Sequence, residues 1–172
     1  MQARGFTLIE VLVALFVLAI GVLGAGAAQL AAGRTRQQAA LGAEAALLAA
    51  SLAARMQANA AVAGLPDGAN PYLALDYDAA SDGPPVGGAA CFGASICDPP
   101  ALAAFDLHET RMALHRGFPG GRIAVCRDSA PWSDVDGSYR WECSGEAAAP
   151  LAIKVGWHGS GAAPFHVTLV AR

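Results

Sequence analysis

The chain has 172 residues and a formal net charge of -3, with 55% hydrophobic, 15% charged and only 7% aromatic residues. This length fits one globular domain with an extension, and the scattered lysine and arginine residues argue against a nucleic-acid-binding face. Alanine, leucine and valine supply most of the apolar content, which favours helix.

The first predicted element is a long apolar helix at the N-terminus. No charged residue occurs from Val11 to Gly33, and residues 6–28 are apolar except for Thr7 and Glu10. About 20 such residues cross a bilayer as a helix. Arg4 precedes the helix and favours a cytoplasmic N-terminus. We therefore expect residues 6–30 to form a transmembrane helix and the rest of the chain to face outward.

Two simple interpretations compete with any more specific role for this helix. It could be a secretory signal cleaved near Ala25-Gly26-Ala27, or a plain membrane anchor. Glu10 argues against both, because a carboxylate inside a membrane helix costs about 2.5 to 3.5 kcal/mol and neither alternative gives it a partner. The buried acid therefore indicates a partner for its charge.

Residues 5–15 read GFTLIEVLVAL and resemble the class III signal of type IV pilins and their secretion-system relatives. The resemblance implies a leader of residues 1–5, cleavage by prepilin peptidase between Gly5 and Phe6, N-methylation of Phe6 and a role for Glu10 in assembly. It also implies a pilin-like α+β fold, in which a long N-terminal helix, transmembrane in its first half, packs on a small antiparallel sheet.

A physical argument supports the role implied for Glu10. Cleavage after Gly5 leaves an amine on Phe6, and an α-amino group with a pKa of about 7.7 to 8.0 is largely charged at neutral pH. Inside a helical assembly this amine can lie near Glu10 of a neighbouring subunit, so that two charges costly to bury alone neutralise each other. Such an ion pair fixes the register between neighbouring subunits more than it strengthens their association.

The second part of the helix, residues 31–64, has an amphipathic pattern. Polar residues appear after residue 33, and apolar residues fall three or four positions apart at Leu41, Ala45, Leu48, Leu52 and Met56. This spacing defines one apolar face that packs against a domain. Glycine and proline at 64–68 end the helix.

The remaining residues, 65–172, are expected to form a globular head. Residues 65–100 are rich in Gly, Pro and Asp, which predicts a long loop with a short ordered turn near 72–77. Asp98 followed by two prolines predicts an N-cap and a helix to about Arg116. Alternating residues and turn signals predict antiparallel strands at 121–127, 138–144, 152–158 and 165–171. In the third of these, Ile153, Val155 and Trp157 would share one face against the helix.

The four cysteines, Cys91, Cys97, Cys126 and Cys143, all lie in the head. An even number in an exported domain indicates disulfides, and three pairings are possible. We expect Cys91 to pair with Cys97, since they close a small loop, and Cys126 with Cys143, which would join neighbouring strands. A four-cysteine zinc site is disfavoured, because neither pair has the close spacing of zinc ligands.

No pattern in the chain predicts an enzyme, a cofactor or a resident metal. His108-Glu109 and His115 have the wrong spacing for a zinc protease, and nucleotide-binding and hydrolase motifs are missing. His158 and His166 flank a turn and are expected at the surface. The aspartates near residues 76–83 and 134–137 loosely resemble calcium loops, with solvated turns as the default. Trp132 and Trp141 are interpreted as packing residues.

The head also resembles one subgroup of minor pilins, the type IV pilus modification protein of the PilV type. The similarity lies at residues 55–59 and 98–107, at Cys91 and Cys97, in the Phe-Pro-Gly-Gly of 118–121 before Cys126, and in the strand through Trp157. Members typically have tyrosine where Phe105 stands, and residues 128–146 do not match.

This second resemblance implies a subunit that joins other minor and major pilins to prime pilus assembly, supporting motility or adhesion. Such a subunit is stored in the inner membrane with a periplasmic head, interacts with the assembly machinery, and reaches the cell surface in the pilus. Two alternatives stay open: a minor pseudopilin of a type II secretion system, and an exported soluble protein with a cleaved secretory signal. The mature N-terminus separates the last alternative from the others.

Overall fold

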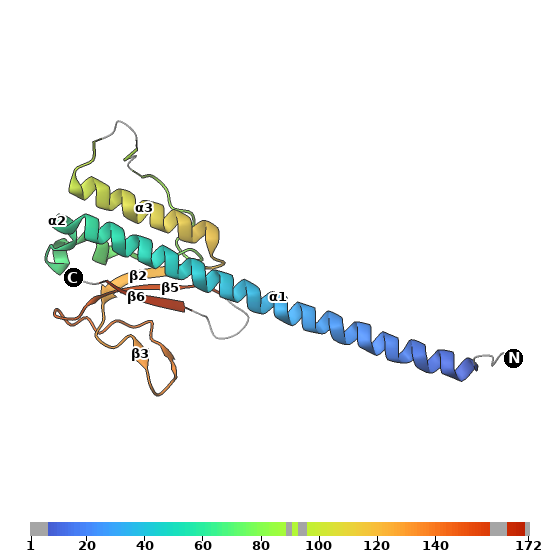
Figure 1. The fold of residues 1–172 in the computed structure, drawn as a ribbon. Helices are drawn as coiled ribbons and strands as arrows, with labels where there is room; N and C mark the ends of the chain where they lie inside the picture. The colour runs from blue at the N-terminus through green and yellow to red at the C-terminus, as the bar shows by residue number, and fades with distance from the viewer. Residues whose placement is uncertain (1–6, 89–90, 93–95, 159–164, 171–172) are drawn as a thin grey trace. The chain divides into compact units, whose positions relative to one another are not determined.

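The structure is a computed structural model that describes residues 7–88, 91–92, 96–158 and 165–170. It divides into two units, residues 1–40 and residues 41–172, which are described separately. Helix α1 (Leu8–Ala58) contributes its first part to one unit and its last part to the other (Figure 1).

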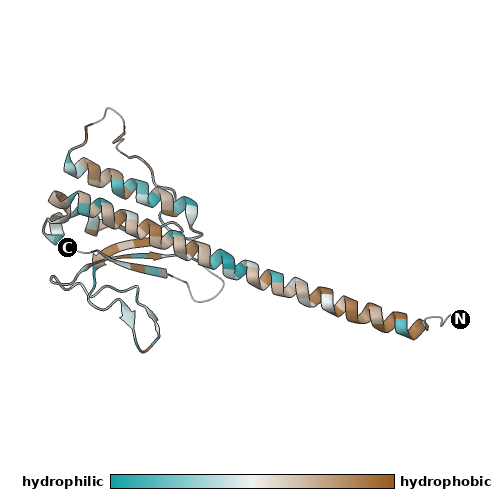
Figure 2. Ribbon diagram, viewed as in Figure 1, coloured by the Kyte–Doolittle hydropathy of each residue, from teal (hydrophilic) through white to brown (hydrophobic). Residues whose placement is uncertain are grey.

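The described part of the first unit is helical from Leu8 onward. Nearly all of its residues are exposed, including Leu8 at 79% and Leu23 at 74%. Figure 2 shows that hydrophobic colour dominates this end of α1. Among the described residues, α1 is the one helix long and apolar enough to cross a membrane. So much exposed apolar surface needs lipid or protein around it.

The second unit is built around the last part of α1, which lies between helix α3 (Pro99–Gly117) and a sheet in Figure 1. The buried residues of α1 recur at helical spacing: Ala45, Ala49, Leu52, Ala53 and Met56. They join one core with residues from the sheet and from α3. The predicted apolar face is therefore confirmed, and its small alanines allow close packing.

The sheet has four antiparallel strands in the order β1 (Asp76–Asp78), β2 (Arg122–Arg127), β5 (Leu151–Gly156) and β6 (Phe165–Val170). Every residue of β5 is buried, because α1 covers one face of the sheet and the chain between β2 and β5 covers the other. Ile153, Val155 and Trp157 all belong to the core, as predicted. The fold is α+β and pilin-like.

Two parts of the predicted sheet are wrong. Only Ser138 and Tyr139 of the expected strand 138–144 are extended, as β4 (Ser138–Tyr139), which pairs with β3 (Trp132–Ser133) in a separate two-stranded sheet. The chain after β4 instead turns its carbonyls toward a buried lysine. Conversely, β1 formed where a loop was expected, because pairing with β2 outweighs the low strand preference of aspartate.

The connection from α1 to α3 begins with α2 (Ala60–Ala63), which lies before the predicted loop of residues 65–100. Inside that loop are two short 3-10 helices, η1 (Asp67–Ala69) and η2 (Pro71–Ala74). The N-cap predicted for α3 is confirmed, since the carboxylate of Asp98 accepts a hydrogen bond from the N–H of Ala101 at 2.8 Å. This cap satisfies a backbone donor that a helix start otherwise leaves unpaired.

A buried polar network joins α1, η2 and α3. The carboxylate of Asp106 accepts hydrogen bonds from Arg55 at 2.9 Å and from the Tyr72 hydroxyl at 3.1 Å. Asn59 donates to the Tyr72 oxygen at 3.2 Å and to the carbonyl of Pro99 at 2.8 Å. Burial raises the pKa of Tyr72 to about 12, so its hydroxyl stays protonated and continues to donate to Asp106.

The turn before β2 requires glycine at position 120. Gly120 has a φ of 55°, and a Cβ there would overlap the ring of His158. We expect Gly120→Ala to lower the free energy of unfolding by about 2 kcal/mol, from backbone strain and the clash. Guanidinium unfolding of the full chain in detergent, followed by tryptophan fluorescence, would measure this.

Gly117→Ala is the matched control for this substitution. Gly117 ends α3 in open space, so alanine there should leave stability within about 0.5 kcal/mol of wild type or raise it. Equal unfolding midpoints for Gly120→Ala and Gly117→Ala would contradict the requirement for glycine at position 120.

Candidate functional site

The N-terminal end of α1 contains the site predicted around Glu10. Thr7 stands directly before the helix, and the carboxylate of Glu10 accepts hydrogen bonds from the N–H and the hydroxyl of Thr7, both at 2.8 Å. The N–H of Glu10 donates back to the Thr7 hydroxyl at 3.4 Å. This reciprocal arrangement is a capping box. Gly5 and Phe6 lie outside the described residues.

The capping box shows how the helix accommodates an acid in an apolar sequence. The two donors of Thr7 and the positive end of the helix dipole both stabilise the carboxylate of Glu10. Both of these hydrogen bonds involve Oε2 of Glu10, and a carboxylate offers about four lone-pair sites in total. Glu10 therefore retains capacity to bind a cationic group from outside its own helix.

The neighbours of Glu10 suit contact with lipid or with other helices. Ile9 is 70% exposed and Phe16 67% exposed. Thr7 was missed as a functional residue at the sequence level, although threonine followed three residues later by glutamate before an apolar run is the signature of a capping box.

Comparison with known families finds a match at the N-terminus. Residues 1–26 match the model described as the prokaryotic N-terminal methylation motif. The match includes Gly5, Phe6 and Glu10. No curated protein and no solved structure matched the chain.

The motif and the fold together indicate a class of protein. A methylation motif opening an exposed apolar helix, followed by a pilin-like α+β head, supports a type IV pilin-like protein, a class of membrane-anchored structural subunits processed by prepilin peptidase. The match ends at residue 26, before the head begins, so the similarity does not distinguish a pilus subunit from a pseudopilin.

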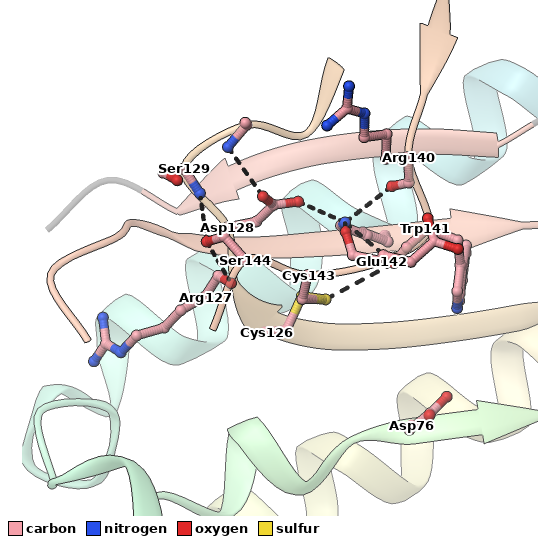
Figure 3. Close-up of a disulfide and its surroundings, with 12 residues drawn as sticks. Asp76, Cys126, Arg127, Asp128, Ser129, Arg140, Trp141, Glu142, Cys143 and Ser144 are labelled. Carbon is pink, nitrogen blue, oxygen red and sulfur yellow. Dashed lines mark hydrogen bonds and ion pairs between the residues drawn. A yellow bond between two sulfur atoms is a disulfide. The ribbon is translucent and has the colours of Figure 1, made fainter. Parts of the chain in front are cut away.

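The structure contains two disulfides, Cys91–Cys97 and Cys126–Cys143, with Cα atoms 5.8 Å and 6.2 Å apart. This is the pairing expected from the sequence. The expectation that the second bond joins neighbouring strands is wrong, because Cys126 lies in β2 but Cys143 follows β4 in an irregular segment. Figure 3 shows this bond and its surroundings.

Two of the aspartates considered for calcium accept hydrogen bonds within their own turns, and a third forms an ion pair. Asp82 accepts a hydrogen bond from the N–H of Asp78 at 2.8 Å, and Asp136 accepts one from the hydroxyl of Ser133 at 2.7 Å. Asp76 pairs with Arg122 at 3.3 Å on the surface. Within the described ranges, no group of three or more His, Cys, Asp or Glu residues is placed to hold a metal.

Three other residues considered in the sequence, His115, Trp132 and Trp141, form packing contacts. His115 shares a hydrogen bond of 2.9 Å with the hydroxyl of Tyr77, which fastens β1 to α3. Trp132 packs edge-on against Tyr139, and Trp141 lies under the guanidinium of Arg122 at 4.5 Å. These contacts agree with the interpretation of both tryptophans as packing residues.

Proposed function

We propose that this protein is a minor type IV pilin that is stored in the inner membrane and then incorporated into a pilus. The observation that carries the proposal is the carboxylate of Glu10, held at the start of an exposed apolar helix inside a methylation motif. In this scheme residues 1–5 are the leader, 6–30 the membrane and assembly helix, 31–64 its amphipathic continuation and 65–172 the head.

The proposed assembly step uses the remaining acceptor capacity of Glu10. Prepilin peptidase cuts between Gly5 and Phe6, and the new amine on Phe6 is methylated but remains charged. When the subunit enters the filament, this amine lies beside Glu10 of a neighbouring pilin, and the ion pair replaces the solvation that each charge loses. The exposed apolar surface of the helix then packs against other helices in place of lipid.

The head fits a location outside the cytoplasm. Both disulfides lie in it, and disulfides persist in oxidising compartments such as the periplasm. Before assembly the head would therefore be periplasmic, and after assembly it would be displayed on the pilus. Its partners would be other minor and major pilins and the assembly machinery of the inner membrane.

The experiment that tests this proposal starts from the mature N-terminus. Intact-mass analysis of the membrane and sheared-pilus fractions should find a chain that begins at Phe6 and carries one extra methyl group. A mature chain that starts near Ala28 would instead indicate a secreted protein and would overturn the proposal.

Deletion of the protein then distinguishes a pilus subunit from a pseudopilin of a type II secretion system. We expect the deletion strain to lose surface pili, counted by electron microscopy, while its secretion of exoproteins stays normal. Normal pili with failed exoprotein secretion would identify a minor pseudopilin of a type II secretion system. Complementation with the wild-type chain is the control in both assays.

A further inference from the structure

Lys154 is the only lysine in the chain, and it is buried. The other ten of the 11 lysine and arginine residues are arginines. Lys154 lies in the middle of β5 with a side-chain exposure of 0%. A buried ammonium is costly unless it is paired and fully hydrogen-bonded, so its surroundings need a physical account.

Four oxygen atoms surround the ammonium nitrogen of Lys154. The carbonyls of Arg140, Trp141 and Glu142 accept hydrogen bonds from it at 2.9, 3.2 and 2.8 Å. A carboxylate oxygen of Asp128 lies at 2.6 Å. Figure 3 labels Asp128, Arg140, Trp141 and Glu142, the four residues that supply these oxygens. Since an ammonium has three protons, the three carbonyls satisfy its donors and Asp128 contributes mainly charge.

These four oxygens are of the kind that bind cations in proteins. Carboxylate and carbonyl oxygens are the ligands that hard cations take from proteins, and here three consecutive carbonyls converge on one point. A compact ammonium with three rotatable donors fits this point, whereas a planar guanidinium would not. We call these four oxygens the cage.

All four cage oxygens come from one segment of chain, residues 128–142, which we call the cage segment. The Cys126–Cys143 disulfide closes the same segment, because Cys126 precedes Asp128 by two residues and Cys143 follows Glu142 directly. The segment also contains β3 and β4 and the exposed side chain of Val135, which is 91% exposed. One covalent bond and one buried cation therefore fasten this surface to the sheet.

We propose that the cage is an alkylammonium-binding site that Lys154 occupies permanently, as a built-in cation that fixes the shape of the cage segment without a bound metal ion. The ammonium does here what a metal ion does elsewhere, since it gathers the oxygens of a segment with little regular structure. The proposal concerns the head alone and does not depend on the role of Glu10.

The test is chemical rescue of Lys154→Ala in the full chain in detergent, followed by hydrogen–deuterium exchange and mass spectrometry. The substitution should accelerate amide exchange in residues 129–142 about 100-fold, because three carbonyls and a carboxylate lose their cation together. Millimolar n-propylammonium, which replaces the missing atoms of the side chain, should restore most of the protection.

Lys154→Arg provides the matched variant, because it keeps the charge and changes the geometry. It should also lose protection in the cage segment, and propylammonium should not restore it. If Lys154→Arg exchanges like wild type, an ordinary ion pair to Asp128 explains the site and the cage is refuted.

Three further outcomes would overturn the proposal. They are unchanged exchange in Lys154→Ala, failure of propylammonium to restore protection, and rescue by calcium chloride in its place. If Lys154→Ala unfolds the whole head, recovery of the fold by propylammonium but not by sodium propionate still supports the site. Failure of both to restore the fold refutes it.

Discussion

Glu10→Ala is expected to reduce the amount of this protein in sheared pili at least about tenfold, because the Phe6 amine of a neighbouring subunit loses its counter-charge in a low-dielectric interior. The same substitution removes a carboxylate from the membrane, which favours storage in the bilayer by about 2.5 to 3.5 kcal/mol. The variant should therefore accumulate in the membrane fraction. Quantitative immunoblots of membrane and pilus fractions measure both changes.

Two variants separate the charge of Glu10 from its role as a helix cap. Glu10→Gln keeps the size of the side chain and a hydrogen-bond acceptor for Thr7 but removes the charge. Its incorporation into pili should therefore fall as much as that of Glu10→Ala. Thr7→Ala removes the capping hydroxyl and costs about 1 kcal/mol at the helix start, and it should retain most incorporation. Normal incorporation of Glu10→Gln would refute the charge-pairing account.

Asp106→Ala is expected to destabilise the head by about 3 kcal/mol. Asp106 is only 3% exposed, and its carboxylate accepts from Arg55 and from Tyr72. Removing it leaves the buried hydroxyl of Tyr72 without an acceptor and Arg55 without its partner. The Arg55 side chain is 41% exposed, so water compensates part of the loss and the cost lies at the low end for a broken buried pair.

Guanidinium unfolding of the full chain in detergent measures this loss. Asp98→Ala is a suitable control, since it removes an exposed carboxylate at the start of α3 and costs only the helix cap, about 1 kcal/mol. An Asp106→Ala midpoint equal to that of Asp98→Ala would show that the network contributes no more than a cap.

The parts of the fold that could be predicted are those with a strong local pattern. The first helix follows from its apolar run and the spacing of Ala45, Leu52 and Met56, and α3 follows from the cap at Asp98. Strands β2 and β5 follow from their apolar residues. The helix position of Glu10 was also predictable, since it depends on neighbours within one turn.

The parts that could not be predicted depend on contacts distant in sequence. Strand β1 exists because β2 pairs with it, and the chain after β4 is irregular because its carbonyls bind Lys154. A lone lysine in a strand of apolar residues was the available signal for this second feature. The carbonyls that bind Lys154 could not be found in the same way. Every residue has a backbone carbonyl, so residue type does not mark which of them bind.

The enclosure of Lys154 has a practical consequence for handling the protein. Because the chain has no other lysine, amine-reactive dyes and succinimide-activated beads find no accessible side-chain amine on the folded head. Coupling is then confined to the terminal amine of the chain, and labels for imaging the subunit on cells need another chemistry, such as an introduced surface thiol.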